Sequence, residues 1–368
     1  MPVVLIALLA LLLASCSPPP PVKLGYVSTL SGRSADLGIS GRNGALLAIE
    51  EINANGGIHG RPVQLVVRDD ALSPEVAASA IEDLAAQKVD AIVGPMLSHM
   101  AFAMAPVATR LQVVLVSPTA TADELLGRDD FLFRLSSPTS AHARLDANFQ
   151  FRHEGRRRIA VAYETTNRTY AEGYLKEFRK TFSDAGGELV MDVAFDSGSH
   201  PDFAGIIRKL GSSRPDALLF IANAVDTVTL AQHSRRQMPD MPLAGVAWAG
   251  TEELLELGGK AIEGMHFGQY FNRDDQTPSY LSFKATYQKR FQELPGFGST
   301  AAYDATRTVL EALQRKRPGQ PLNEALLSLG PFRGVQQPIA FDRFGDALRP
   351  STISVVRNHQ FVTVNDAP

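Results

Sequence analysis

Two stretches of the chain decide the fold: Val93-Gly94-Pro95-Met96-Leu97-Ser98-His99 and Leu115-Val116-Ser117-Pro118-Thr119-Ala120-Thr121. Each begins as a short apolar strand and breaks at glycine or proline into a loop of small hydroxyl residues. Parallel strands present their carboxyl ends at one edge of a sheet, and that edge is where ligands bind in open α/β folds. The two stretches therefore predict a parallel sheet with ligand-binding loops.

The rest of the chain repeats this pattern of strands and helices joined by short connections. Around the opening stretches we predict strands at 23–28, 63–68, 91–93 and 113–116, with helices at 45–52, 74–84 and 100–111. A second series follows, with strands at 158–162, 188–195, 217–221 and 243–248 and helices at 171–185, 203–210 and 227–237. Continuously apolar strands that alternate with helices indicate parallel sheets covered on both faces. We therefore predict two α/β lobes of the same type.

The tail of the chain cannot form a third domain. It contains a predicted strand at 264–270, helices at 279–290 and 299–315, and short antiparallel strands at 338–342, 351–357 and 360–364. These elements must return to complete the two lobes.

Composition narrows the class of protein. The 368 residues are 45% hydrophobic and 20% charged, with a formal net charge of −3, so the chain is globular and lacks the basic surplus of a nucleic-acid-binding protein. The single cysteine excludes an intrachain disulfide and a cysteine-based metal site. The chain carries no phosphate-binding loop, dinucleotide fingerprint, nucleophile elbow or histidine cluster. We expect a protein that is not an enzyme and holds no cofactor or metal.

The N-terminus indicates export. Residues 3–14 form an apolar run that is too short to anchor a protein in a bilayer but suits a signal peptide. The run ends in Leu13-Ala14-Ser15-Cys16, which resembles the lipobox of bacterial lipoproteins. That resemblance implies a signal peptide at 1–15 and a lipid anchor on Cys16, followed by a stiff proline-rich tether at 16–22. The alternative is an ordinary signal peptide that happens to precede a cysteine.

Motifs along nearly the whole mature chain resemble the leucine/isoleucine/valine-binding protein family, the type I periplasmic substrate-binding proteins of ABC importers. The segment Gly41-Arg42-Asn43-Gly44-Ala45 and the run from Glu50 to Val63 carry this resemblance. Further matches follow in the family's order, at residues 69–70, 93–95, 117–121, 170–173, 202–203, 215–217 and 302–305.

The resemblance implies two Rossmann-like lobes joined by three crossovers, near residues 136, 266–270 and 339–342. The N-terminal lobe would comprise 23–137 and 269–340, and the C-terminal lobe 138–268 and 341–368. It also implies an extracytoplasmic protein that captures a small carboxylate-bearing ligand, an amino acid or a related organic acid or amide, and delivers it to importer permease subunits. The alternative is a sensory module of the same fold that signals to a partner protein.

Residue by residue, the resemblance assigns the ligand carboxylate to Ser98, Thr119 and Thr121. Hydroxyls and free N–H groups at a helix start can hold an anion without a cationic side chain. The same hydroxyls could instead cap the helices that follow them. From the second lobe the family's pattern places Tyr170 and Asn223 over the ligand.

Departures from the family's pattern concern the rest of the ligand. The first-lobe position that is usually aromatic falls near Leu37, and the acidic residue that would pair with a ligand ammonium is replaced by Ala247, next to Trp248. Either Asp226 or Glu252 takes over that role, or the ligand carries no α-ammonium. Trp248 offers a face to a ring or a quaternary cation, and His99 could add a donor or pH sensitivity.

Overall fold

The computed structural model describes residues 20–364. The predicted signal peptide, the predicted anchor at Cys16 and the first part of the tether lie outside the described residues. Within residues 20–364, none of the helices combines the length and apolar character needed to cross a bilayer.

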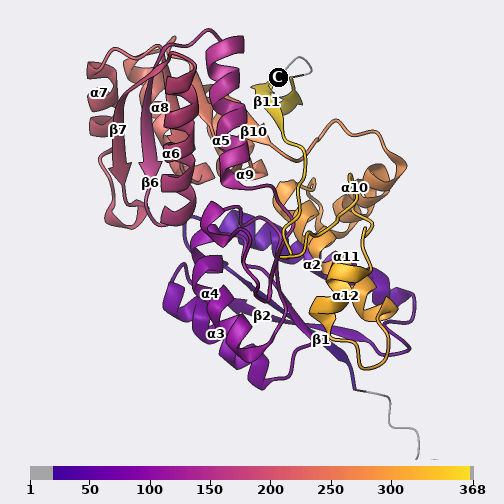
Figure 1. Cartoon of the computed structure of the whole chain (residues 1–368). Helices are drawn as coiled ribbons and strands as arrows, with labels where there is room; N and C mark the ends of the chain where they lie inside the picture. Colours follow the sequence, from indigo (N-terminus) through magenta and orange to yellow (C-terminus); the bar gives the residue numbers. More distant parts are fainter. Residues whose placement is uncertain (1–19, 365–368) are drawn as a thin grey trace, which may run out of the picture.

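The chain forms two lobes, each built on one sheet (Figure 1). The first lobe has a parallel five-stranded sheet in the order β2-β1-β3-β4-β5. Its strands are β1 (Val22–Ser28), β2 (Val63–Asp69), β3 (Ala91–Val93), β4 (Leu115–Ser117) and β5 (Leu132–Arg134). Its helices are α2 (Ala35–Ala54), α3 (Pro74–Ala86), α4 (Ser98–Leu111), α10 (Pro278–Phe291), α11 (Phe297–Arg315) and α12 (Leu322–Ser328). In Figure 1, α3 and α4 lie on one side of this sheet and α2 with α11 on the other.

The second lobe has a seven-stranded sheet in the order β12-β11-β10-β9-β8-β6-β7. Strands β6 to β10 run parallel to one another. At the edge, β11 pairs antiparallel with β10, and β12 pairs antiparallel with β11. They are β6 (Arg158–Glu164), β7 (Glu188–Phe195), β8 (Ala217–Ile221), β9 (Leu243–Gly245), β10 (His266–Gln269), β11 (Thr352–Arg357) and β12 (Gln360–Thr363). The helices are α5 (Thr139–Asn148), α6 (Arg168–Asp184), α7 (Phe203–Ser212), α8 (Ala224–Gln237) and α9 (Glu252–Gly258). The predicted fold class, two α/β lobes with mainly parallel sheets, is confirmed.

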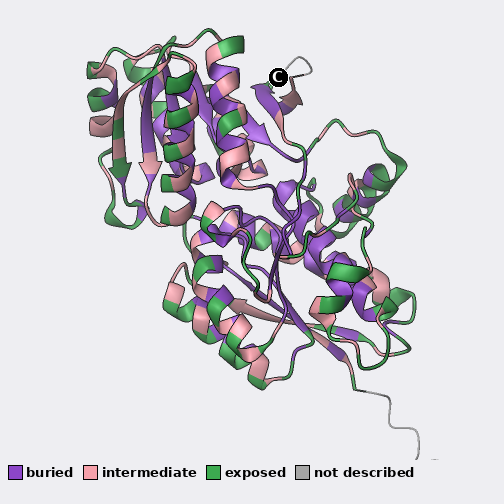
Figure 2. Ribbon diagram, in the orientation of Figure 1, coloured by how far each residue is buried: buried purple, intermediate pink, exposed green. Residues whose placement is uncertain are grey.

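Burial follows the position of most strands in their sheets (Figure 2), although the edge strand β5 is buried throughout where residue 346 bridges it. The central strands β3, β4 and β8 are buried at every residue because helices cover both of their faces. The edge strands β2 and β7 are largely half-exposed. Runs of apolar residues therefore marked the sheet centres correctly.

Strand order places the ligand-binding edge of each lobe. The order reverses between β1 and β3 in the first sheet and between β6 and β8 in the second. In doubly wound sheets the crevice at such a reversal, beyond the carboxyl ends of the strands, is the usual ligand site. The loops after β1, β3, β6 and β8 therefore define the face that each lobe turns toward the other.

Three crossovers join the lobes, at residues 135–138, 270–277 and 350–351. We expected the last one near 339–342, but that segment still belongs to the first lobe. Phe341 bridges Ala347 and Asp346 bridges Arg134, so residues 338–349 form isolated bridges rather than the expected antiparallel strand. The chain changes lobe only after Arg349, which forms a buried ion pair at 2.9 Å with Asp304 of α11.

Candidate functional site

A small cavity lies between the lobes at the strand ends described above. Its volume is about 30 Å³ in this closed form. The lining residues are Leu37, Met96, Leu97, Ser98, Thr119, Thr121 and Phe297 of the first lobe, His142, Asn167, Tyr170, Ala247 and Trp248 of the second, and Tyr270 of the middle crossover. A larger hollow of 390 Å³ beside Glu51 and Arg307 lies on the outside of the first lobe, and one of 480 Å³ lies between the lobes beside Asp36 and Glu253. The smaller cavity differs from both because the loops after β3, β4 and β6 line it.

Ser98, at the start of α4, presents a hydroxyl group whose proton is free. Its Oγ accepts the N–H groups of Thr121 (3.0 Å) and Ala122 (3.2 Å). A hydroxyl has two lone pairs and one proton, so both acceptor positions are used and only the proton remains. Ser98 is 2% exposed and lines the cavity. It therefore suits a ligand acceptor such as a carboxylate or carbonyl oxygen.

The two threonines of the following loop differ in role. Thr121 Oγ1 and Thr139 Oγ1 share a hydrogen bond of 2.8 Å, in which either hydroxyl can donate, and of the two only Thr121 lines the cavity. Thr119 Oγ1 donates to the Met96 carbonyl at 2.6 Å, which binds the two hydroxyl loops to each other. Thr119 therefore lines the cavity with its hydroxyl already engaged.

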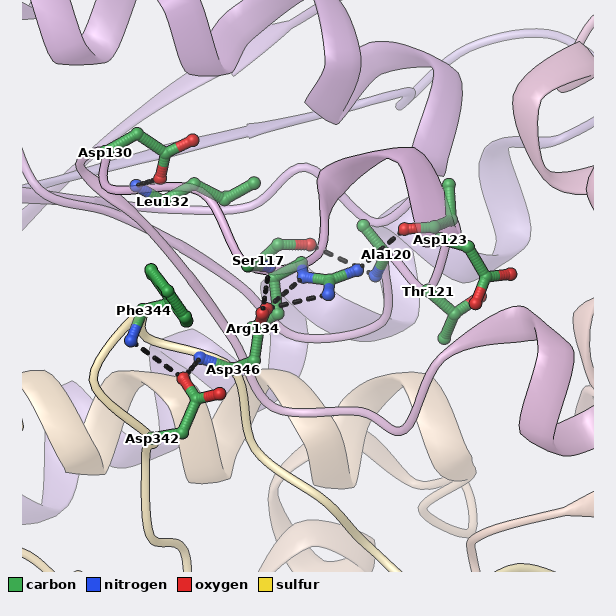
Figure 3. A network of polar contacts seen from close by, with 12 residues as sticks. Ser117, Ala120, Thr121, Asp123, Asp130, Leu132, Arg134, Asp342, Phe344 and Asp346 are labelled. Carbon is green, nitrogen blue, oxygen red and sulfur yellow. Dashed lines mark hydrogen bonds and ion pairs between the residues drawn. The ribbon is translucent and has the colours of Figure 1, made fainter.

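A buried polar network holds the Thr119–Thr121 loop in place (Figure 3). Ser117 Oγ accepts the Ala120 N–H at 3.1 Å, and Arg134 Nη1 donates to the Ala122 carbonyl at 2.9 Å. Arg134 also forms an ion pair at 2.7 Å with Asp346, and both side chains are at least nine-tenths buried. Because Asp346 belongs to the segment before the last crossover, the loop is fixed to the hinge of the molecule.

Aromatic side chains form the remaining walls. The rings of Tyr170 and Trp248 pack edge to face with centroids 6.0 Å apart, and Tyr270 and Phe297 do the same at 6.0 Å. Phe297 reaches the cavity because α11 approaches α2 closely at Gly44, where a Cβ would lie 2.0 Å from the Ser299 carbonyl oxygen. The site therefore combines a hydroxyl-lined side with apolar ring faces.

Three buried polar atoms at the cavity lack a hydrogen-bond partner within the described residues: Tyr170 Oη, Tyr270 Oη and His142 Nε2. Burial lowers the pKa of His142 to about 4 and raises that of Tyr270 to about 12, so both side chains are neutral near pH 7. His142 Nδ1 lies 3.0 Å from Ser351 Oγ, which fixes the orientation of the ring. All three atoms are almost inaccessible in this closed form.

The expected site residues divide into those that line the cavity and those that make other contacts near it. Leu37, Ser98, Thr119, Thr121, Tyr170, Ala247 and Trp248 line it, whereas Asn223 and His99 do not. Asn223 caps α8 and donates to Asp226 at 2.7 Å. His99 contacts the other lobe. Its backbone N–H donates to Asn167 Oδ1 at 3.1 Å, and its ring Nδ1 lies 3.0 Å from Thr169 Oγ1. Sequence reasoning missed Met96, Leu97, His142, Asn167, Tyr270 and Phe297.

Neither acid proposed as a partner for a ligand ammonium reaches the cavity. Asp226 is fully buried and forms an ion pair at 2.6 Å with Arg33 of the first lobe. Glu252 forms an ion pair with Arg273 at 2.8 Å. Of the described residues that line the cavity, none is Asp, Glu, Lys or Arg.

Several polar contacts bridge the lobes, so the structure is in a closed form. Besides Arg33–Asp226 and the His99 contacts, Thr251 Oγ1 donates to Asp36 Oδ2 at 2.8 Å. Asp36 also faces Glu253, and burial raises the pKa of both carboxyls, that of Glu253 to about 7. No group of three or more metal-binding side chains occurs within residues 20–364.

Two lobes that close over a small neutral cavity define a ligand-capturing protein of the clamp type. The chain belongs to the periplasmic binding protein family, which it matches over residues 21–360. The predicted family membership is thereby confirmed, and the family implies an extracytoplasmic location.

Known relatives agree with this class. The chain is 24% identical to the leucine-, isoleucine-, valine-, threonine- and alanine-binding protein of Pseudomonas aeruginosa, over 88% of this chain and 87% of that one. Its fold matches that of the branched-chain amino acid transporter substrate-binding protein LivJ of Streptococcus pneumoniae, crystallised with isoleucine. The TM-score is 0.86 at 25% identity, with 94% of this chain and 100% of that one covered.

A Rhodopseudomonas palustris solute-binding protein of an ABC transporter, crystallised with 3,4-dihydroxybenzoic acid, matches with a TM-score of 0.84 at 22% identity. The match covers 95% of this chain and 96% of that one, and it shows a likeness of fold alone. The chain is thus a substrate-binding protein of the ABC importer class and, as predicted, not an enzyme.

Proposed function

We propose that the protein is a lipid-anchored receptor that captures a small carboxylate-bearing ligand between its lobes and delivers it to the permease of an ABC importer. The observation that carries the proposal is the Ser98 hydroxyl, whose acceptor positions are both filled by backbone N–H groups. Its remaining proton donates into a cavity whose described lining residues carry no opposing negative charge. Thr121 adds a second hydroxyl to the same side, and it can donate to a ligand when Thr139 is the donor of their shared hydrogen bond.

Capture proceeds by closure of the clamp. The ligand docks on the first lobe, and the second lobe then covers it with Tyr170 and Trp248. The closed form gains the interlobe bonds of Arg33, Asp36 and His99 in addition to the ligand contacts. A ligand that touches both lobes shifts the population toward this form, which the permease then recognises.

The proposal is tested with the double variant Ser98→Ala, Thr121→Ala. A thermal-shift screen of small carboxylates and amides first finds a ligand, because binding to the native state raises the apparent melting temperature. We expect the double variant to bind it at least about tenfold more weakly, which corresponds to about 1.4 kcal/mol or more.

Ser234→Ala is the matched control. Ser234 is also a fully buried serine whose hydroxyl is engaged, donating to the Leu230 carbonyl at 2.9 Å, but it lies in α8 and does not line the cavity. An unchanged calorimetric affinity in a folded double variant would refute the site. Uptake of labelled ligand by a deletion strain, restored by the wild type but not by the double variant, tests the role in import.

A further inference from the structure

We propose that the ligand is a small aromatic monocarboxylate that bears a neutral hydrogen-bonding substituent, and that the cavity rejects α-amino acids. This inference rests on the proposed function and specifies its ligand. It is carried by three properties of the cavity: its charge, its aromatic walls and its unpartnered polar atoms.

The charge of the lining excludes an ammonium group. The position after β9 is Ala247, Asp226 is engaged by Arg33, and Glu252 by Arg273. A buried ammonium without a carboxylate partner costs several kcal/mol. The same lining has no lysine or arginine, so it offers no partner to a second carboxylate.

One further acid lies behind the aromatic wall. Asp146 of α5 is 6% exposed, does not line the cavity and accepts a hydrogen bond from the Tyr174 hydroxyl. Its position behind Tyr170 and Tyr174 keeps it from direct contact with a ligand. Burial raises the pKa of Asp146 to about 7, so a large share of these groups is uncharged at neutral pH.

The walls favour a flat apolar body. Tyr170 with Trp248 and Tyr270 with Phe297 form two edge-to-face pairs on separate parts of the chain. Each pair exposes ring surface to the cavity, and a third ring packs on such surfaces with a preferred geometry that an aliphatic chain lacks.

The unpartnered atoms specify the substituent. Tyr170 Oη, Tyr270 Oη and His142 Nε2 belong to side chains that are more than nine-tenths buried. A buried polar group without a partner is costly, and a ligand hydroxyl, carbonyl or amide would complete one or more of these hydrogen bonds. Because all three groups are neutral, the matching substituent is neutral as well.

Calorimetry with the full mature chain and matched ligand pairs tests the inference. Within the pairs phenylalanine and 3-phenylpropanoate, and leucine and 4-methylpentanoate, only the α-ammonium differs. We expect each amino acid to bind at least about 100-fold more weakly than its partner. We also expect 4-hydroxybenzoate to bind at least about fivefold more tightly than benzoate.

The variants Tyr170→Phe and Tyr270→Phe keep the rings and remove one hydroxyl each. We expect at least one of them to bring the ratio of the 4-hydroxybenzoate and benzoate affinities close to one. General damage to the wall would weaken both ligands and leave that ratio intact.

Two outcomes separate this inference from the proposed function. Binding of leucine or phenylalanine as tight as that of its partner, lost in Ser98→Ala, Thr121→Ala, would overturn the inference and leave the proposed function standing. If no acid or amino acid binds, or if none loses affinity in Ser98→Ala, Thr121→Ala, both the inference and the proposed function are overturned.

Discussion

Removal of the Arg33 side chain should weaken ligand binding without unfolding either lobe. Arg33 lies in the loop after β1, and its Nε and Nη2 donate to Asp226 Oδ1 at 3.1 and 2.6 Å. The other carboxylate oxygen, Oδ2, accepts hydrogen bonds from Asn223 and Ser197 of its own lobe. When the clamp opens, Asp226 keeps these partners and water replaces Arg33. The Arg33 contact therefore stabilises only the closed form.

The size of the effect follows from burial. Loss of one partner of a buried ion pair costs about 3–5 kcal/mol. Asp226 is fully buried, but the Arg33 side chain is 45% exposed, so solvent screening reduces the contribution. We expect Arg33→Met to destabilise the closed form by about 1–2 kcal/mol, which weakens ligand binding about 5- to 30-fold.

The assay is calorimetry with the ligand that the thermal-shift screen identifies, alongside X-ray scattering of the ligand-free protein. Arg68→Met is the matched control, because Arg68 pairs with Asp83 at 2.7 Å within the first lobe and is similarly exposed. An Arg33→Met affinity within twofold of the wild type, or an equal loss in both variants, would show that this bond does not govern closure.

Three further predictions concern protonation and anchoring. Burial raises the pKa of Glu253 to about 7 in the closed form, and opening separates Glu253 from Asp36, so closure takes up a proton. Ligand affinity should therefore fall as pH rises through 7, by less than about tenfold per pH unit. The variant Glu253→Gln should flatten this profile of affinity against pH, measured by calorimetry. The raised pKa of Asp146, about 7, stabilises the fold most below pH 4, and this stabilisation is lost as pH rises to 7. The wild type should therefore lose on the order of 3–4 kcal/mol relative to Asp146→Asn in urea unfolding across that range, and equal pH slopes would contradict the assignment. Cys16→Ser should release the protein from the membrane fraction on fractionation, and its retention there would exclude the lipid anchor.

The sequence predicted the first-lobe side of the site better than the second-lobe side. Ser98, Thr119 and Thr121 follow two adjacent buried strands, so strand order alone brings their loops together. His142, Tyr270 and Phe297 reach the cavity from helix starts and a crossover that are far apart in the chain. Their position depends on how the lobes dock, which no local pattern encodes.

Interlobe contacts were equally invisible in the sequence. Asn167-Arg168-Thr169 matches the triplet of a glycosylation site, yet Asn167 and Thr169 both contact His99 across the cleft. Asn223 and Asp226 were expected near the ligand, and the structure has them in a polar cluster with Ser197 and Arg33. A short polar side chain at a strand end can serve a ligand, a helix cap or the opposite lobe, and only the tertiary structure distinguishes these roles.

Helix α4 receives its N-terminal cap from the other lobe. Its own N-cap residue, Leu97, makes no side-chain cap bond, and the His99 N–H is paired by Asn167. A helix start without such a partner leaves its first N–H groups to water. Each opening of the clamp thus exposes one identifiable amide at the start of α4, next to the cavity-lining Ser98. Deuterium exchange at the His99 amide consequently reports the fraction of time that the protein spends open, without a bound ligand or an attached probe.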